Sequence, residues 1–192
     1  MNICIYGASS NTIDKIYTDT AYSIAAEMAR RGHTLIFGGG NGGVMGATAR
    51  GAYDNGGKII GVSPSFFRVD GVLFDKCTEL IYTTTMRERK QILEDYSDAF
   101  IVAPGGIGTY DEFFEILTLK QLEQHNKPIV MYNVNGYYDE MLTMLQKTAD
   151  CNFMKQKSLE LFKCCTRENE VLDYIENYSS RQIDIHELKD IT

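Results

Sequence analysis

No run of apolar residues in this 192-residue chain approaches the roughly 20 residues that a membrane-spanning helix requires, so the sequence predicts no transmembrane segment. The amino end also lacks the basic stretch and longer apolar stretch of a signal peptide, because Met1 leads directly into a strand-like segment. From these two absences we expect a cytoplasmic protein that does not associate with membranes.

Cysteine and histidine are too few and too scattered for a disulfide framework or a metal centre. The five cysteines are odd in number and form no C-x-x-C pair, and the three histidines lie far apart in the chain. Such a pattern is typical of reduced thiols in the cytoplasm. We therefore expect neither a disulfide nor a metal site.

Positive charge is in deficit, with 19 lysines and arginines against 26 acidic residues and a net charge of −7. This balance argues against a nucleic-acid partner or an anionic membrane surface, although a local basic cluster can still hold one phosphate. Repeats and linkers are absent from the sequence, and its length suits one core. We expect a single domain over residues 1–192, with residues 179–192 forming a loosely packed tail.

Short apolar segments alternate with helical ones throughout the chain. Strands are predicted at Asn2–Tyr6, Thr34–Phe37, Lys58–Val62, Leu80–Tyr82, Asp98–Val102, Ile129–Tyr132 and Leu161–Cys164. Helices are predicted at Tyr17–Arg31, from the glycine-rich segment Gly38–Gly46 to Tyr53, and at Met86–Tyr96, Tyr110–Gln124, Tyr137–Ala149 and Glu168–Tyr178. The pattern predicts an α/β fold: a doubly wound, Rossmann-like, mostly parallel sheet with helices on both faces.

Right-handed crossovers place the carboxyl ends of parallel strands on one edge of the sheet, where ligands bind. One loop at this edge is Pro104–Thr109, between a predicted strand and a predicted helix. Its glycines, Gly105, Gly106 and Gly108, can take positive φ and direct backbone amides toward one point. The positive end of the helix faces the same point, so we expect a phosphate there, with Thr109 adding a hydroxyl or capping the helix.

Acidic residues follow this loop at helical spacing. Glu112 lies one turn into the predicted helix, within reach of a sugar attached to the bound phosphate, and Glu115 lies on the same face. The alternative is that both carboxylates only stabilise the amino end of the helix.

Two other segments at the same edge are candidates for the site. Gly38–Gly46 lacks the G-x-G-x-x-G spacing of dinucleotide-binding loops, and the chain contains no P-loop motif. In the segment Met86-Arg87-Glu88-Arg89-Lys90, residues Met86, Arg89 and Lys90 lie along one side of a helix, toward the site or toward glutamates of a facing helix. The alternative is a solvated helix start with local ion pairs.

Three motifs resemble those of a known family, the LOG family of cytokinin riboside 5′-monophosphate phosphoribohydrolases, which are often mislabelled lysine decarboxylases. Residues 104–112 reproduce P-G-G-x-G-T-x-x-E, residues 86–90 resemble M-x-x-R-K, and residues 38–46 resemble G-G-G-x-x-G-[LV]-M-G. The resemblance covers Ile3 to Leu145 in unbroken order. Arg87 departs from the pattern, because many members carry histidine there.

The resemblance implies a phosphoribohydrolase, similar to AMP nucleosidases, that cleaves the N-glycosidic bond of AMP or N6-substituted AMP without a cofactor, and it implies a homodimer. The catalytic pair would be Arg89 and Glu112, with Glu112 stabilising positive charge at C1′. The implied substrate-binding residues are Ser9, Gly39, Gly40, Met45, Met86, Lys90, Gly105, Gly106, Gly108, Thr109 and Glu115. An apolar N6 group would contact Met45, Met86 or residues of a partner subunit.

Other functions are compatible with the same fold. One is a non-catalytic module that binds a nucleotide or the molybdenum cofactor. Another is a true lysine decarboxylase, which requires a lysine that binds pyridoxal phosphate. A third is a scaffold within an assembly.

Overall fold

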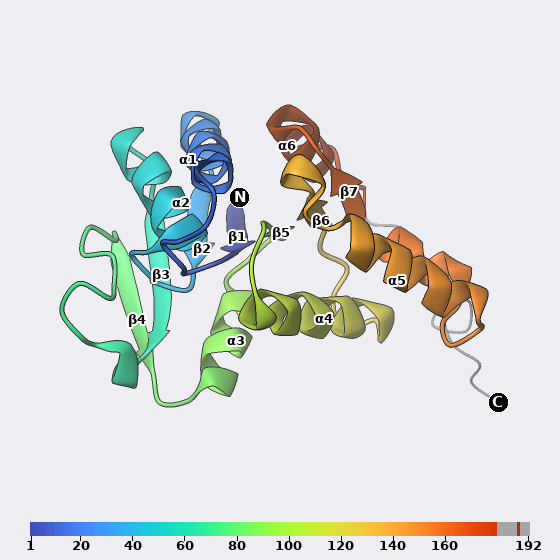
Figure 1. The fold of residues 1–192 in the computed structure, drawn as a ribbon. Coiled ribbons are helices and arrows are strands. Elements are labelled where there is room, and N and C mark those ends of the chain that lie inside the picture. The colour runs from blue at the N-terminus through green and yellow to red at the C-terminus, as the bar shows by residue number, and fades with distance from the viewer. Residues whose placement is uncertain (180–187, 189–192) are drawn as a thin grey trace.

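The structure is a computed structural model that describes residues 1–179 and 188 (Figure 1). The predicted tail, residues 179–192, lies outside the described residues except for positions 179 and 188. The elements, in chain order, are β1 (Asn2–Tyr6), α1 (Lys15–Arg30), β2 (Thr34–Phe37), α2 (Gly43–Asp54), β3 (Ile59–Pro64), the 3-10 turn η1 (Ser65–Phe67), β4 (Glu79–Thr83), α3 (Met86–Asp95), β5 (Ala99–Val102), α4 (Ile107–Gln121), β6 (Ile129–Tyr132), η2 (Val134–Gly136), α5 (Asp139–Asp150), η3 (Gln156–Leu161), β7 (Lys163–Cys165) and α6 (Glu168–Glu176).

The strands form one seven-stranded sheet in the order β4-β3-β2-β1-β5-β6-β7, and every pairing between these named strands is parallel. The chain first builds outward from β1 to β4, then crosses back through α3 to place β5 on the other side of β1. This reversal confirms the predicted doubly wound α/β fold. It also creates a switch point between β1 and β5, where parallel sheets of this type bind ligands.

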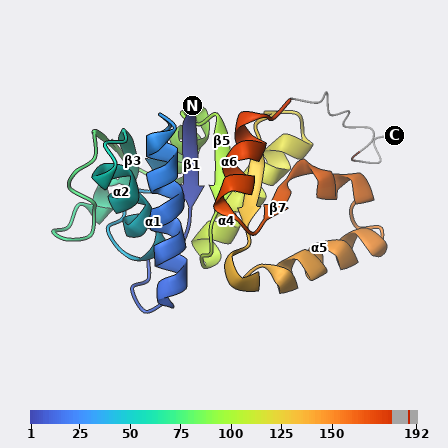
Figure 2. The same cartoon turned by 90° about the horizontal axis from the view of Figure 1, so that it is seen from above.

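Both faces of the sheet are buried, which is why the strands are almost continuously apolar. On one face, Ile3 and Ile5 of β1 pack in a core with α1, α2 and α6. On the other face, Cys4 and Tyr6 pack with α3, α4 and α5. Figure 1 shows α1 and α2 on the opposite side of the sheet from α3 and α4, and Figure 2 shows α1 lying between α2 and α6. None of the described helices has the length and apolar character needed to cross a membrane.

Two element boundaries differ from the prediction in ways that matter for the site. Helix α4 begins at Ile107 rather than at Tyr110, because Gly106 is its N-cap and the next residues already have helical geometry. Strand β3 continues through Ser63 to Pro64, which pairs with Thr83 of the edge strand β4. A proline can end a strand there because it is the last residue of the ladder.

A buried histidine lies in the connection between α4 and β6. The Nε2 atom of His125 is 2.8 Å from the carbonyl oxygen of Ile116, and its Nδ1 accepts a hydrogen bond from the amide of Lys127 at 3.2 Å. A neutral ring with its proton on Nε2 satisfies both contacts. Burial lowers the pKa of His125 to about 4, and the charges of Lys127 and Lys120 act in the same direction.

We predict that this histidine makes the fold sensitive to acid. The unfolded chain binds a proton below the ordinary pKa of 6.5, whereas folded His125 does so only near pH 4, so stability present above pH 6.5 is lost as the pH falls through this window. The loss amounts to about 3 kcal/mol. His125→Gln, whose amide can keep both hydrogen bonds without titrating, is expected to lose less stability in urea unfolding between pH 7 and pH 4. Parallel losses in the two proteins would contradict this assignment.

Candidate active site

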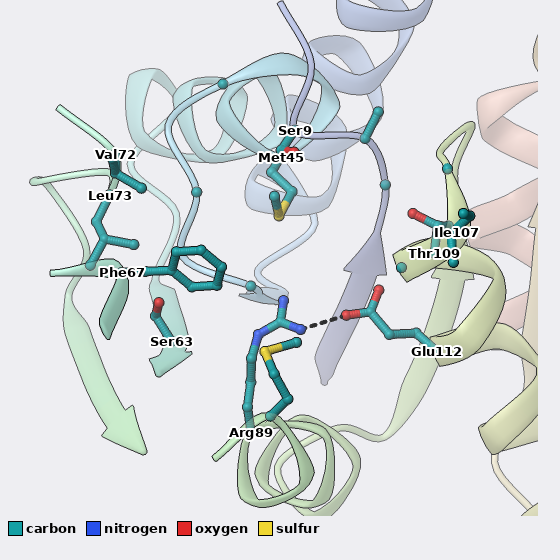
Figure 3. A pocket seen from close by; sticks show the side chains of 18 of the residues that line it. Ser9, Met45, Ser63, Phe67, Val72, Leu73, Arg89, Ile107, Thr109 and Glu112 are labelled. Atoms are coloured by element: carbon teal, nitrogen blue, oxygen red, sulfur yellow. Dashed lines mark hydrogen bonds and ion pairs between the residues drawn. The ribbon is translucent and has the colours of Figure 1, made fainter. Parts of the chain in front are cut away.

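The carboxyl ends of β1, β2, β3 and β5 surround a cavity of about 640 Å³ (Figure 3). Its walls come from the loop after β1, the glycine-rich loop after β2, the connection from β3 to β4, the first turns of α3 and the start of α4. The volume is in the range of small-molecule sites. The cavity therefore lies at the edge of the sheet that the topology predicts.

The glycine turn before α4 offers backbone amides to this cavity. The first amides of a helix have no carbonyl partner within the helix, and Gly106, Gly108 and Thr109 at this end line the cavity. A Cβ atom added at Gly106 or Gly108 would meet no other atom within 4 Å, so the turn is bordered by open space. Free amides, open space and the positive end of a helix together favour an anion.

The expected reason for these glycines is wrong, because Gly105, Gly106 and Gly108 are not among the glycines with positive φ. Gly105 is required by packing instead: a Cβ there would lie 2.1 Å from the Thr109 hydroxyl and 2.9 Å from the Ala8 amide. Gly105 is therefore beneath the turn and does not line the cavity. At Gly105 the turn therefore requires a small residue, and at none of the three glycines does it require a left-handed backbone.

Positive φ occurs in the loop Gly38–Gly46, called here the second glycine-rich loop, at Gly39 (78°) and Gly43 (55°). The Gly43 amide donates to Oδ1 of Asn11 at 2.9 Å, which joins this loop to the loop after β1. Gly39 is buried below the cavity wall, where its carbonyl accepts from the amide of Phe74 at 2.9 Å. Gly40 and Met45 line the cavity, whereas Gly39 does not.

A buried ion pair forms the floor of the cavity. Arg89 of α3 and Glu112 of α4 are each only 8% exposed and point toward one another, with 2.8 Å between Nη1 and Oε1 (Figure 3). Nε of Arg89 also donates to the carbonyl of Val62 at 3.2 Å. A Cβ at Gly38 would lie 2.0 Å from Nη2 of Arg89, so a glycine there lets the guanidinium occupy this position.

Burial and the arginine act on Glu112 in opposite directions. Burial raises the pKa of the Glu112 carboxyl, and the charge and hydrogen bond of Arg89 oppose this increase. Beneath the pair, burial also raises the pKa of Cys4 and of Tyr6, and the charge of Glu112 adds to both shifts. Glu112 therefore faces the cavity with one arginine beside it, and its buried neighbours Cys4 and Tyr6 stay neutral.

Lys90 does not line the cavity, and the structure places it in a different ion-pair group. Its Nζ atom lies 3.1 Å from Asp111 and 2.7 Å from Glu115, both on α4. These contacts join α3 to α4 beside the buried pair, and they hold Glu115 away from the cavity. Lys90 therefore points toward a glutamate of the facing helix, as one of the two predicted orientations had it, and not toward the cavity.

Nine of the thirteen residues predicted from the sequence line the cavity: Ser9, Gly40, Met45, Met86, Arg89, Gly106, Gly108, Thr109 and Glu112. Four do not, namely Gly39 and Gly105, which pack beneath the loops, and Lys90 and Glu115, which pair with charged neighbours. Arg87, the departure from the family pattern, is exposed and also lies outside the cavity lining.

One wall of the cavity contains no residue that was predicted as part of the site, although the loop at Ser63 was expected at this edge. Ser63 at the end of β3, Phe67 of η1 and the segment 71–73 line it. The amide of Asn41 donates to the carbonyl of Val72 at 2.9 Å, so this wall is hydrogen-bonded to the second glycine-rich loop. The available signal was an aromatic pair, Phe66 and Phe67, in a segment without helical or strand periodicity that follows a strand ending at the binding edge.

Two tyrosines that support the glycine turn were also missed. The hydroxyl of Tyr138 donates to the carbonyl of Ala103, and that of Tyr137 donates to the carbonyl of Gly105, both at 2.7 Å. The hydroxyl of Tyr110 lies 3.3 Å from that of Tyr137. The turn is thus held by residues that follow β6 and do not line the cavity.

Comparison with known protein families identifies relatives over most of the chain. A family model described as "Possible lysine decarboxylase" matches residues 45–175. The probable cytokinin riboside 5′-monophosphate phosphoribohydrolase LOGL3 of Oryza sativa subsp. japonica is 33% identical over 175 residues, which are 91% of this chain and 83% of that protein. The cytokinin riboside 5′-monophosphate phosphoribohydrolase LOG2 of Arabidopsis thaliana is 31% identical over 182 residues, 95% of this chain and 85% of that protein.

Solved structures share the fold at lower sequence identity. The molybdenum cofactor carrier protein of Chlamydomonas reinhardtii superposes with a TM-score of 0.69 and 21% identity, covering 91% of this chain and 95% of that one. At this identity the likeness concerns the fold.

The two tyrosine hydroxyls allow a matched test of how the glycine turn is held. Tyr138→Phe should lower the free energy of unfolding by about 1–3 kcal/mol, because it leaves the buried carbonyl of Ala103 without that partner. Tyr137→Phe removes a bond of the same length from a half-buried tyrosine, where water can replace it, so its cost should be smaller. Chemical denaturation of both variants checks the order, and equal costs would contradict it.

Proposed function

This chain belongs to the LOG family, and on that basis we propose that it hydrolyses the N-glycosidic bond of a purine nucleoside 5′-monophosphate, releasing the free base and ribose 5-phosphate. The substrate is AMP or an N6-substituted AMP such as a cytokinin riboside 5′-monophosphate. The observation that carries the proposal is the buried Glu112 carboxylate, which lines the same cavity as the open first turn of α4.

The arrangement of groups supports this substrate class. The amides of the first turn of α4, with Ser9 and the Thr109 hydroxyl, would bind the 5′-phosphate. Glu112 lies in the second turn of the same helix, where a ribose attached to that phosphate would meet it. Gly40 would let the second glycine-rich loop approach the nucleotide closely.

The proposed reaction breaks the bond between C1′ of the ribose and a ring nitrogen of the base. Positive charge develops on the sugar as this bond lengthens, and the Glu112 carboxylate stabilises it. Glu112 also accepts a proton from water as the hydroxyl adds to C1′ and then releases it to solvent, and the departing base takes up a proton from solvent, so that one water is consumed in each turnover. The charge of Arg89 favours the ionised form of Glu112 against the effect of burial. Arg89 also holds the carboxylate in place through the 2.8 Å contact and orients the substrate.

Two alternatives have less support. The likeness to a molybdenum cofactor carrier is confined to the fold, whereas the phosphoribohydrolases are relatives in sequence at 31–33% identity. Decarboxylation with pyridoxal phosphate requires a lysine in the site, and there is none among the described residues that line the cavity. The homodimer implied by the family resemblance stays a prediction.

We predict that Glu112→Gln, which preserves the shape of the side chain, lowers turnover by about 10²–10⁴-fold because the charge at C1′ loses its carboxylate. Chromatography of products from AMP and a panel of other nucleoside monophosphates measures this loss. Calorimetric binding of ribose 5-phosphate should persist in the variant, since the phosphate contacts come from the glycine turn. Full activity of the variant would refute the catalytic role, and tight retention of AMP by the unaltered protein without release of adenine would favour a binding module.

The position of the bound phosphate can be tested at Gly108. Gly108→Ala should preserve thermal stability, because its Cβ meets no other atom within 4 Å, but it should raise KM for AMP roughly tenfold by filling space that the phosphate requires. Thr118→Ala changes an exposed residue of the same helix outside the cavity and serves as the control. An unchanged KM in Gly108→Ala would place the phosphate elsewhere.

A further inference from the structure

We propose that Phe67 selects a purine base by stacking its ring on the base of the bound nucleotide. The inference rests on the proposed function and adds the residue that recognises the leaving group. Phe67 belongs to η1, outside every motif shared with the family, and it lines the same cavity as Glu112.

The cavity has two chemically different ends. At one end, the α4 turn offers backbone amides and the Thr109 hydroxyl beside the apolar side chain of Ile107. The facing end carries the apolar side chains of Phe67, Val72 and Leu73, with Ser63 below Phe67 in this view. Figure 3 shows Thr109 on the side opposite Phe67 and Leu73, with Arg89 and Glu112 between them.

A nucleoside monophosphate has the same order of groups. Its phosphate and its base are attached to opposite ends of the ribose, so a phosphate at the α4 turn and a ribose at Glu112 direct the base toward the apolar end. The only aromatic ring among the described residues lining that end belongs to Phe67, and an aromatic face is the surface on which a flat base stacks. A purine, with two fused rings, covers more of this face than a pyrimidine.

Phe67 is not part of either core cluster, and the segment that follows it is joined to the second glycine-rich loop. The ring is 44% exposed, and the chain after η1 returns to that loop through Val72 and Phe74, which bond to Asn41 and Gly39 at 2.9 Å. An isolated antiparallel bridge between Gly40 and Leu73 lies between these bonds. The aromatic wall is therefore joined to the loop that borders the nucleotide, while its exposed ring remains available to a ligand.

Calorimetric binding in a Glu112→Gln background, which keeps AMP intact, tests the proposal. Phe67→Ala should weaken binding of AMP by roughly 5- to 100-fold, weaken binding of UMP less, and change binding of ribose 5-phosphate by no more than about twofold. Phe67→Tyr should retain AMP affinity, and Phe67→Leu, which is apolar without an aromatic face, should not.

Phe66→Ala is the matched control. Its ring lies 4.7 Å from that of Phe67, but Phe66 is 59% exposed and does not line the cavity, so all three affinities should be unchanged. Unchanged AMP affinity in Phe67→Ala, or equal losses for AMP and ribose 5-phosphate, would overturn the role of Phe67. The proposed hydrolysis fails separately if the unaltered protein binds AMP and releases no adenine, and the binding data then still decide the role of Phe67.

Discussion

The site depends on one buried ion pair, because two charges removed from water must be paired closely and held by further hydrogen bonds. Arg89 and Glu112 meet this requirement through a 2.8 Å contact, the carbonyl of Val62 and the absence of a side chain at Gly38. Neither helix can move far without leaving a buried charge unpaired. Lys90 of α3 adds further ion pairs to α4, with Asp111 and Glu115, outside the cavity.

The topology of the sheet makes this pair accessible to a ligand. Helix α3 carries the chain from β4, at the side of the sheet, back to β5, which lies next to β1. Helix α3 begins, and α4 leaves β5, at the carboxyl ends of the strands. The pair therefore lies at the switch point, between the amide-rich start of α4 and the apolar wall from the β3–β4 connection. Glu112 at this boundary lies between the amides of the α4 turn and the apolar wall, which is the order of surroundings that the proposed hydrolysis of a phosphorylated nucleoside requires.

The glycines around the cavity have different physical roles. Gly38 and Gly105 are needed because a Cβ atom would collide with Arg89 or with Thr109, and Gly39 and Gly43 adopt positive φ. Gly106 and Gly108 have neither constraint and leave open space at the helix terminus. A glycine-rich motif in a sequence gives no way to separate these roles, since each depends on atoms from other segments. The tyrosine hydroxyls that bind the carbonyls of Ala103 and Gly105 illustrate the same dependence.

The sequence by itself determined the alternation of strands and helices and the edge of the sheet at which the cavity lies, because these follow from periodicity and from the handedness of crossovers. It also identified nine residues of the cavity lining, because these belong to motifs contained in short segments. Only the tertiary structure decided that Lys90 and Glu115 pair away from the cavity, that Phe67 and Leu73 form its apolar wall, and that Tyr137 and Tyr138 support the turn. These features join residues distant in the chain through hydrogen bonds and packing. Local patterns carry no record of such contacts.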